Sequence, residues 1–336
     1  MNKWIKRLLK TVVILAMSWI VTGLVLAFTS APTFRAIPKP AKAKPSTACV
    51  NTSDVACLTM RDGVVLSARW HHGSEARTIV LVHGIFSDSS EMEVAATALN
   101  RESGSTVLNL DLRGHGRSGG QQFDINHIGQ YEEDLADIVK SLRATRPDQQ
   151  IVLAGHSMGG GVVLRYAERK LVPPVDAYLL LAPNLGYDAP TTRKSSPESG
   201  DAKKGVTTDV SEPREAPIKL HLKRTVGLMM LNAFGFHGLD GLGTLYVNAQ
   251  SDGELLHYSY RAMRTTSPDD YQLSLAADSR PMLIVVGDKD EAFDAAEYPA
   301  VARLHSSATV EIVAGAGHDS VLASPQMIAA AKRWLQ

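Results

Sequence analysis

The sequence predicts an α/β fold with a mostly parallel central sheet and helices on both faces. From residue 56 onward, short apolar runs alternate with amphipathic segments of helical spacing. Several of the apolar runs end in glycine-rich turns, and 44% of all residues are hydrophobic, which is enough for a sizeable core. Strands that alternate with helices form parallel sheets that are covered on both faces. Ligand sites in such sheets lie at the carboxyl ends of the strands.

Each expected element follows from a local pattern. The Asp-Gly turn at 62–63 joins the first two strands as a hairpin, and the later strands are continuous apolar runs. The helices carry apolar residues three and four positions apart. The expected strands are 57–60, 63–70, 78–84, 106–111, 151–153, 177–184, 281–288 and 309–315, and the expected helices are 91–100, 128–145, 162–169 and 324–336.

Residues 186–280 interrupt this alternation and are expected to form a lid insertion between core segments 56–185 and 281–336. Within it, residues 191–217 are polar and are expected to be disordered. The second part, 218–264, is apolar and is expected to be helical. Its stretch VGLMMLNAFGF, residues 226–236, is expected either to pack the lid onto the core or to face an acyl chain.

The N-terminal segment, residues 1–30, differs in kind from the rest. Residues 11–28 carry no charge, and about 18 such residues suffice for a membrane-spanning helix. We expect an uncleaved signal-anchor. A cleavable signal peptide with a weak site at FTSA is the alternative, and a buried soluble helix would show a polar face. Residues 31–55, rich in Pro, Ala and Lys, are expected to act as a tether.

The orientation of this anchor is less strongly encoded. Four basic residues precede the span, and four more follow it in the tether, so the positive-inside rule gives a weak preference. The short basic tail favours a cytoplasmic N-terminus, with the catalytic domain outside the cytoplasm. A disulfide between Cys49 and Cys57 would suit such an oxidising compartment, but the spacing alone fits two free cysteines equally well.

Composition excludes several classes of partner. Lys plus Arg and Asp plus Glu number 35 each, which gives no reason to expect a nucleic-acid partner. Two cysteines cannot build a cysteine-rich zinc site or a disulfide scaffold. No metal-ligand spacing is present in the sequence, so we expect neither a metal nor a cofactor.

The stretch AGHSMGGG, residues 154–161, holds the main candidate for chemistry. It lies between an expected strand and an expected helix, and it fits the G-x-S-x-G nucleophile elbow around Ser157. In such an elbow the glycines allow strand and helix to approach closely, and the strained serine presents its hydroxyl. A plain glycine-rich turn is the alternative, whereas a phosphate loop would require Gly-Lys-Ser/Thr.

Further motifs carry a family resemblance over about residues 60–336. They are LVHGIF, DLRGHGRSGG, GHSMGGG, VVGDKDEAF and VAGAGHDS. With them the chain resembles the α/β-hydrolase superfamily, and it is most similar to the branch of monoacylglycerol lipases, lysophospholipases and serine aminopeptidase-like enzymes. The resemblance implies the α/β-hydrolase fold with a helical lid insertion.

A serine hydroxyl needs a base to take its proton and an acid to orient that base. His318 follows the last expected strand, at the sheet edge where Ser157 also lies, and is the expected base. Asp288 and Asp290 both follow the preceding strand. The family pattern places the acid three residues after the glycine that ends this strand, which implies Asp290, while Asp288 would cap the turn.

The oxyanion hole requires backbone N–H donors that are fixed in advance. In this fold one donor is the residue after the nucleophile, Met158, and the other lies after the third strand. The resemblance points there to Ile85, with Phe86 as the alternative. We expect structural roles for His83 and for Arg113 and His115 of the DLRGHGRSGG loop.

The favoured function is a membrane-anchored serine hydrolase that cleaves carboxylic esters, such as monoacylglycerol-like or lysophospholipid-like esters, through an acyl-enzyme on Ser157. An amidase or aminopeptidase with the same triad is the alternative among enzymes, and its amine-binding carboxylates would come from Asp240, Asp252 or Glu254. A non-catalytic hydrolase-fold binding protein is the alternative outside enzymes. The expected partners are a small-molecule ester and the membrane.

Overall fold

The computed structural model describes residues 3–34, 39–40, 49–170, 173–193, 218–251, 253–305 and 308–336. The chain divides into two compact units. One holds residues 44–202 and 264–336, and the other holds residues 1–43 and 203–263. Parts of the expected tether, residues 194–217 of the segment expected to be disordered, and Asp252 lie outside the described residues.

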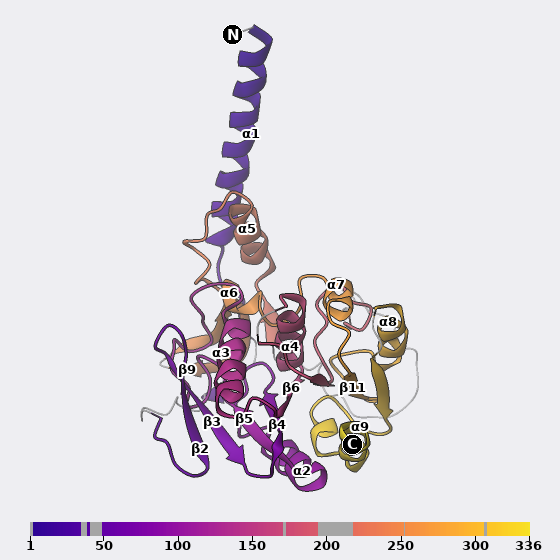
Figure 1. Cartoon of the computed structure of the whole chain (residues 1–336). Coiled ribbons are helices and arrows are strands. Elements are labelled where there is room, and N and C mark those ends of the chain that lie inside the picture. The colour runs from indigo at the N-terminus through magenta and orange to yellow at the C-terminus, as the bar shows by residue number, and fades with distance from the viewer. Residues whose placement is uncertain are drawn as a thin grey trace, which may run out of the picture. The chain divides into compact units, whose positions relative to one another are not determined.

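The first unit is built on an eight-stranded sheet, drawn from violet to yellow in Figure 1. Six neighbouring strands are parallel, and the hairpin of the first two strands joins one edge in antiparallel pairing. The expected α/β class is therefore confirmed. In sheet order the strands are β12 (Thr309–Val313), β11 (Met282–Gly287), β7 (Ala177–Leu181), β6 (Gln150–His156), β4 (Ser74–Val82), β5 (Ser105–Leu110), β3 (Val65–His71) and β2 (Val55–Thr59).

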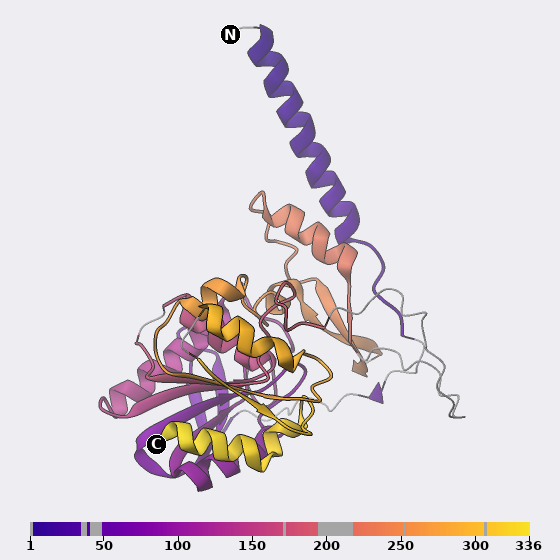
Figure 2. The same ribbon diagram turned by 90° about the vertical axis from the view of Figure 1, so that its right-hand side faces the viewer.

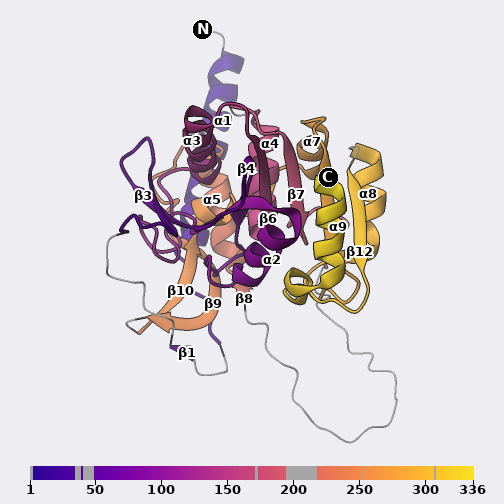
Figure 3. The same cartoon turned by 60° about the horizontal axis from the view of Figure 1, so that its bottom comes forward.

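Helices cover both faces of this sheet (Figures 1 and 3). On one face α2 packs against α9, and on the other α4 contacts both α3 and α7, while α7 contacts α8. The helices are α2 (Glu93–Ser103), α3 (Gln130–Thr145), α4 (Met158–Glu168), α7 (Tyr271–Ala276), α8 (Tyr298–His305) and α9 (Pro325–Leu335), with short 3₁₀ turns η1 (Ala295–Glu297) and η2 (Ser320–Ala323).

Local sequence explains these boundaries. The β2–β3 hairpin turns at Gly63, whose φ of 83° lies in the left-handed region that favours glycine. The central strands are apolar throughout because both faces are buried, and Ile79, Val80, Leu81 and Val82 of β4 have no exposed surface. Helix α3 begins two residues later than expected because Gly129, with φ 101°, sits at its N-cap.

The second unit contains helix α1 (Lys3–Ala27), which is long and apolar enough to cross a membrane by length and composition. The part of the insertion that lies in this unit contains less helix than the sequence predicted. Residues 243–251 and 254–259 form strands because β-branched and aromatic residues recur there, as in the run TLYV. The elements are β1 (Lys39–Pro40), β8 (Ile218–Leu220), α5 (Leu222–Asn232), β9 (Gly243–Ser251), β10 (Glu254–Ser259) and α6 (Tyr260–Met263), and β9 pairs with the three other strands.

A disulfide bond joins Cys49 to Cys57 just before and within β2, with a Cα–Cα distance of 5.7 Å. The sequence alone had left this pairing open. The bond ties the chain entering the first unit to the edge of its sheet, because β2 is the outermost strand.

Candidate active site

Ser157 lies at the sharp turn between β6 and α4, with φ 53° and ψ −115°. A non-glycine residue with positive φ is under backbone strain. The neighbouring glycines permit this conformation because they have no Cβ atoms. A Cβ at Gly155 would lie 2.3 Å from the carbonyl carbon of Gly159, and one at Gly159 would lie 2.4 Å from the Val82 oxygen. The strand and helix therefore approach as closely as a nucleophile elbow requires.

The structure brings His318 and Asp290 together from the loops after β12 and β11. Asp290 Oδ2 lies 2.9 Å from Nδ1 of His318, and its Oδ1 accepts the backbone N–H groups of Ala292 and Phe293, both at 2.8 Å. Burial alone would raise the pKa of Asp290, but these hydrogen bonds outweigh it and hold the pKa below its ordinary value. Asp290 is therefore a carboxylate aimed at one nitrogen of the imidazole.

Asp288 points elsewhere. Its Oδ1 accepts the N–H of Gly315 at 2.6 Å, which ties the turn after β11 to the turn after β12. Its Oδ2 lies 3.6 Å from the Lys289 ammonium. Of the two aspartates that the sequence offered, the structure places Asp290 against the imidazole and Asp288 in a turn.

His156, the residue before Ser157, is a neighbour that the sequence analysis missed. Its Nε2 lies 3.1 Å from the backbone oxygen of His318, and the two rings are 4.7 Å apart between centroids. Burial, with repulsion from His318, lowers the pKa of His156 to about 3, so the ring is neutral and donates this hydrogen bond. Glu291 Oε2 accepts the His318 N–H at 3.0 Å. Both contacts fix the backbone that carries the imidazole.

The same neighbourhood contains a geometric grouping of metal-ligand types. Ligand atoms of His156, His318 and Asp319 lie within 4.8 Å of one another. However, His156 Nε2, which lies 4.0 Å from Asp319 Oδ1, is hydrogen-bonded to a backbone carbonyl. A neutral donor nitrogen in that bond cannot also coordinate a cation, so the donor set does not fit a metal ion as it stands.

The loop after β4 runs directly beside the serine. A Cβ at Gly84 would lie 3.5 Å from the Cβ of Ser157, and Ile85 and Phe86 follow in the chain. His83 shapes this loop as expected: its Nδ1 donates to Gly84 O at 2.8 Å while its Nε2 accepts the Leu112 N–H at 3.1 Å. Met158 opens α4, at the positive end of the helix dipole.

The Arg113 loop is structural, as the sequence analysis expected. Arg113 is buried and forms ion pairs with Asp62 at 2.8 Å and with Asp134 at 2.7 Å. These bonds tie the loop to the β2–β3 turn and to α3. Paired guanidinium and carboxylate groups in a buried position hold a loop in one geometry.

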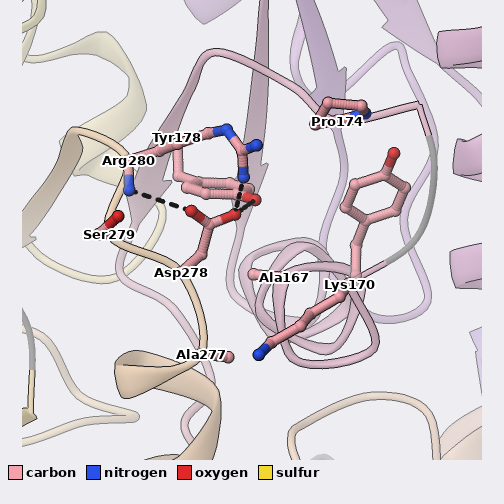
Figure 4. A pocket seen from close by; sticks show the side chains of 9 residues that line it. Ala167, Lys170, Pro174, Tyr178, Ala277, Asp278, Ser279 and Arg280 are labelled. Carbon is pink, nitrogen blue, oxygen red and sulfur yellow. Dashed lines mark hydrogen bonds and ion pairs between the residues drawn. The ribbon is translucent and has the colours of Figure 1, made fainter.

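A separate hollow of about 520 Å³ lies beside Tyr178, Asp278 and Arg280 (Figure 4). Asp278 accepts the Tyr178 hydroxyl at 2.7 Å and also pairs with Arg280. Tyr178 is near the start of β7, and Arg280 directly precedes β11, so this hollow is at the amino ends of the strands. Ser157 follows the carboxyl end of β6, at the opposite edge of the sheet.

Several known proteins are similar to this chain in sequence. The family model described as "Serine aminopeptidase, S33" matches residues 73–202. A monoacylglycerol lipase of Mycolicibacterium smegmatis is 33% identical over 30% of this chain, and the match spans 36% of that protein. An sn-1-specific diacylglycerol lipase of Xenopus laevis is 29% identical over 71% of this chain and 73% of its own length.

Solved structures extend the likeness of fold. A monoacylglycerol lipase from Paleococcus ferrophilus has a TM-score of 0.55 with 18% identity over 80% of this chain and 98% of its own. An esterase from Pyrococcus furiosus has a TM-score of 0.54 with 17% identity over 89% of this chain and 97% of its own. Fold, elbow motif and relatives agree that the chain is an α/β-hydrolase, and its sequence is similar to those of monoacylglycerol lipases and related ester-hydrolysing enzymes.

Proposed function

We propose that this chain is a serine hydrolase that cleaves carboxylic esters through an acyl-enzyme on Ser157. The observation that carries the proposal is the strained elbow of Ser157 at the sheet edge that also holds the hydrogen-bonded pair of His318 and Asp290. The nucleophile Ser157, the orienting acid Asp290 and the base His318 follow one another along the chain in the order that this fold uses.

Each group has a distinct role in the proposed reaction. His318 takes the proton from the Ser157 hydroxyl as the oxygen attacks the ester carbonyl, and later gives that proton to the leaving alcohol. The backbone N–H groups of Met158 and Ile85 donate to the oxyanion of the tetrahedral intermediate. Asp290 keeps the proton of the imidazole on Nδ1, so that Nε2 faces the serine. A water activated by His318 then releases the acid, and no cofactor is required.

The substrate class we propose is an acyl ester with a small polar head group, of the monoacylglycerol or lysophospholipid kind. Relatives named as monoacylglycerol and diacylglycerol lipases support this choice. Burial of one CH₂ group is worth about 0.8 kcal/mol. Each two added carbons of an acyl chain that enters an apolar pocket therefore raise kcat/KM by up to about tenfold.

An aminopeptidase is the second candidate, because the matching family model carries that description. Such an enzyme must hold a free amine with a carboxylate. In the insertion, Asp240 is buried and already accepts the Asn232 amide at 2.7 Å and contacts His237 at 3.1 Å. Because Asp240 is already hydrogen-bonded to these partners, it is poorly placed to bind a substrate amine, which favours an esterase over an aminopeptidase.

A substrate panel tests the choice. We expect kcat/KM to rise from acetyl to medium-chain p-nitrophenyl esters and to exceed that for aminoacyl p-nitroanilides. Ser157→Ala measured beside the natural chain identifies turnover by contaminants. Faster cleavage of the anilides would favour the aminopeptidase, and a rate that is highest on acetate and falls with chain length would contradict the lipid-like pocket.

We also propose that α1 anchors the enzyme in a membrane with the catalytic unit outside the cytoplasm. The four basic residues before the apolar run support a cytoplasmic N-terminus, and the Cys49–Cys57 disulfide supports an oxidising compartment. Protease added to intact spheroplasts should digest the catalytic unit. Digestion only after lysis would reverse the orientation, and release of a soluble mature form would favour a cleaved signal peptide.

A further inference from the structure

Helix α5 presents an apolar stripe to its surroundings. Leu222, Val226 and Met229 are 63%, 39% and 50% exposed, and their spacing of four and three residues places them on one face. On the opposite side of the helix, Leu228 and Leu231 are buried. Two further apolar side chains, Phe234 and Phe236, follow the helix and are also exposed.

The buried side of α5 lies against the second half of α1 (Figures 1 and 2). The two backbones touch where Gly23 meets Gly227, since a Cβ added at Gly227 would lie 2.6 Å from the Gly23 oxygen. The side chain of Leu231 packs beside Gly23, where an added Cβ would lie 3.1 Å from the Leu231 Cγ atom. Glycine contacts of this kind let membrane helices approach closely, because lipid supplies no hydrophobic force between them.

Residues at the start of α5 form hydrogen bonds with backbone carbonyl groups at the C-terminal end of α1. The Arg224 guanidinium donates to the backbone oxygens of Ala27 and Thr29, each at 2.8 Å. His221 Nε2 lies 3.2 Å from the same Thr29 oxygen. The last carbonyls of a helix have no intrahelical donors, and a cation is favoured there by the helix dipole. Helix α1 therefore takes its C-terminal cap from α5.

A third contact fixes the direction of α5. The Trp19 indole N–H donates to the backbone oxygen of Met230 at 3.1 Å. Met230 is in the last turn of α5, where carbonyls lack intrahelical donors, and an indole N–H in hydrocarbon also needs a partner. Ala27 meets Arg224 and Trp19 meets Met230, so the helices are antiparallel. From Ala27 to Trp19, α1 descends about 12 Å at 1.5 Å per residue.

We propose that α5 enters the same membrane leaflet as the C-terminal half of α1, with its apolar stripe against lipid acyl chains. This rests on the membrane anchor proposed above. In the C-terminal half of α1, Val21 and Val25 are likewise exposed apolar side chains. Lys223, at the shallow end of α5, is exposed and long enough to reach the head groups. Helix α5 of the insertion then docks on the membrane anchor α1, and lipid acyl chains contact the apolar stripe of α5.

Depth-dependent quenching tests the proposal on the full chain reconstituted in phosphatidylcholine vesicles. Met229→Cys and Leu222→Cys each carry an NBD fluorophore, and the natural cysteines do not react because they are bonded to each other. We expect nitroxide groups on acyl chains to quench both labels, with Met229 about 10 Å deeper than Leu222 along the helix. Met17→Cys in α1 is the positive control, and the exposed Asp148→Cys is the water-exposed control.

The outcomes separate this inference from the anchor. Quenching at Met17 with a water-exposed Met229 would overturn the inference and leave the anchor standing. Water exposure at both positions would overturn the anchor and the inference together. A Met229 label that is shielded from water but not quenched by lipid would indicate a protein partner and would also overturn the proposal.

A glycine substitution tests the docking on α1. Gly227→Leu should cut the quenching at Met229 to the level of Asp148, while turnover of a soluble p-nitrophenyl ester stays within about twofold and reports that the catalytic unit is folded. Gly238→Leu is the matched control, because a Cβ there meets nothing within 4 Å. Undiminished quenching at Met229 in Gly227→Leu would show that insertion does not depend on α1, and would overturn the docking.

Discussion

Asp290→Asn and Asp288→Asn form a matched pair of substitutions, because both aspartates follow β11 and they differ in their partners. Asp290 Oδ1 accepts the N–H groups of Ala292 and Phe293, both at 2.8 Å. An asparagine at 290 keeps its oxygen toward these two donors, since an NH₂ group there would face two N–H groups. Its NH₂ group must then face Nδ1 of His318.

This orientation reverses the hydrogen bond on which the base depends. Nδ1 of His318 must become an acceptor, so the proton of the neutral imidazole moves to Nε2, and Nε2 can no longer take a proton from Ser157. The same asparagine substitution in other Ser-His-Asp triads lowers kcat by about 10⁴-fold. At about 1.36 kcal/mol per tenfold, this is a loss of about 5.5 kcal/mol of transition-state stabilisation.

The assay is kcat on a short p-nitrophenyl ester, with Tm measured on the same preparations to establish that each variant folds. Asn at 288 keeps an oxygen for the Gly315 N–H, so we expect Asp288→Asn to retain activity within about threefold. A larger loss in Asp288→Asn than in Asp290→Asn would refute the assignment of the acid. So would an Asp290→Asn variant that stays within about tenfold of the natural chain with an unchanged Tm.

Three further predictions concern residues around the site and the disulfide. His156→Leu removes the donor to the His318 carbonyl and should lower kcat about tenfold with KM unchanged. His156→Gln keeps a donor and should recover most of the rate. Equal losses of kcat in both variants would contradict a positioning role for His156. Because burial lowers the pKa of His156 to about 3, the unfolded chain binds more protons than the folded one between that pH and about 6.5. The free energy of unfolding should therefore fall as the pH drops through this window, by up to about 1.4 kcal/mol per pH unit. His156→Gln should reduce this dependence of the unfolding free energy on pH, measured by urea titrations. An unchanged pH dependence would show that His156 does not cause it. Replacing Cys49 and Cys57 by serine removes a bond of sequence separation 8 and should lower the free energy of unfolding by about 2.5 kcal/mol on the loop-entropy model, and no change in urea midpoint would mean that the loop is already constrained without the bond.

The fold class and the positions of the candidate residues were predictable because they depend on local patterns and on one topological rule. Continuous apolar runs between helices predict parallel strands, and the carboxyl ends of such strands share one edge of the sheet. Ser157 directly follows β6, and Asp290 and His318 lie in the loops that follow β11 and β12. Their nearness therefore needed only the order of elements, without knowledge of side-chain packing.

Contacts that join distant segments were not predictable in this way. The hydrogen bond from His156 to the His318 backbone spans 162 residues and uses a residue type that the elbow motif leaves free. The signal for it was present only as a histidine within the G-x-S-x-G motif. The strands of the insertion were missed for a different reason, since short apolar runs such as TLYV fit a buried helix and a strand equally well.

The pairing of α1 with α5 shows the same limit. Both segments are visibly apolar in the sequence, but nothing in either sets the register that brings Gly23 against Gly227. The sequence offered substrate contact or core packing for residues 226–236. In the structure Leu228 and Leu231 are buried, while Met229 and Phe234 are about half exposed, at 50% and 46%.

Covalent labelling with a fluorophosphonate probe reports the activated nucleophile itself, so it can identify the serine that attacks the ester. We expect one adduct, located by peptide mass spectrometry on the peptide that contains Ser157. Ser157→Ala should abolish this adduct and lower kcat on esters by about 10⁶-fold, as expected for a triad that acts as a unit. An adduct on another serine, or full esterase activity in a folded Ser157→Ala variant, would show that Ser157 is not the nucleophile.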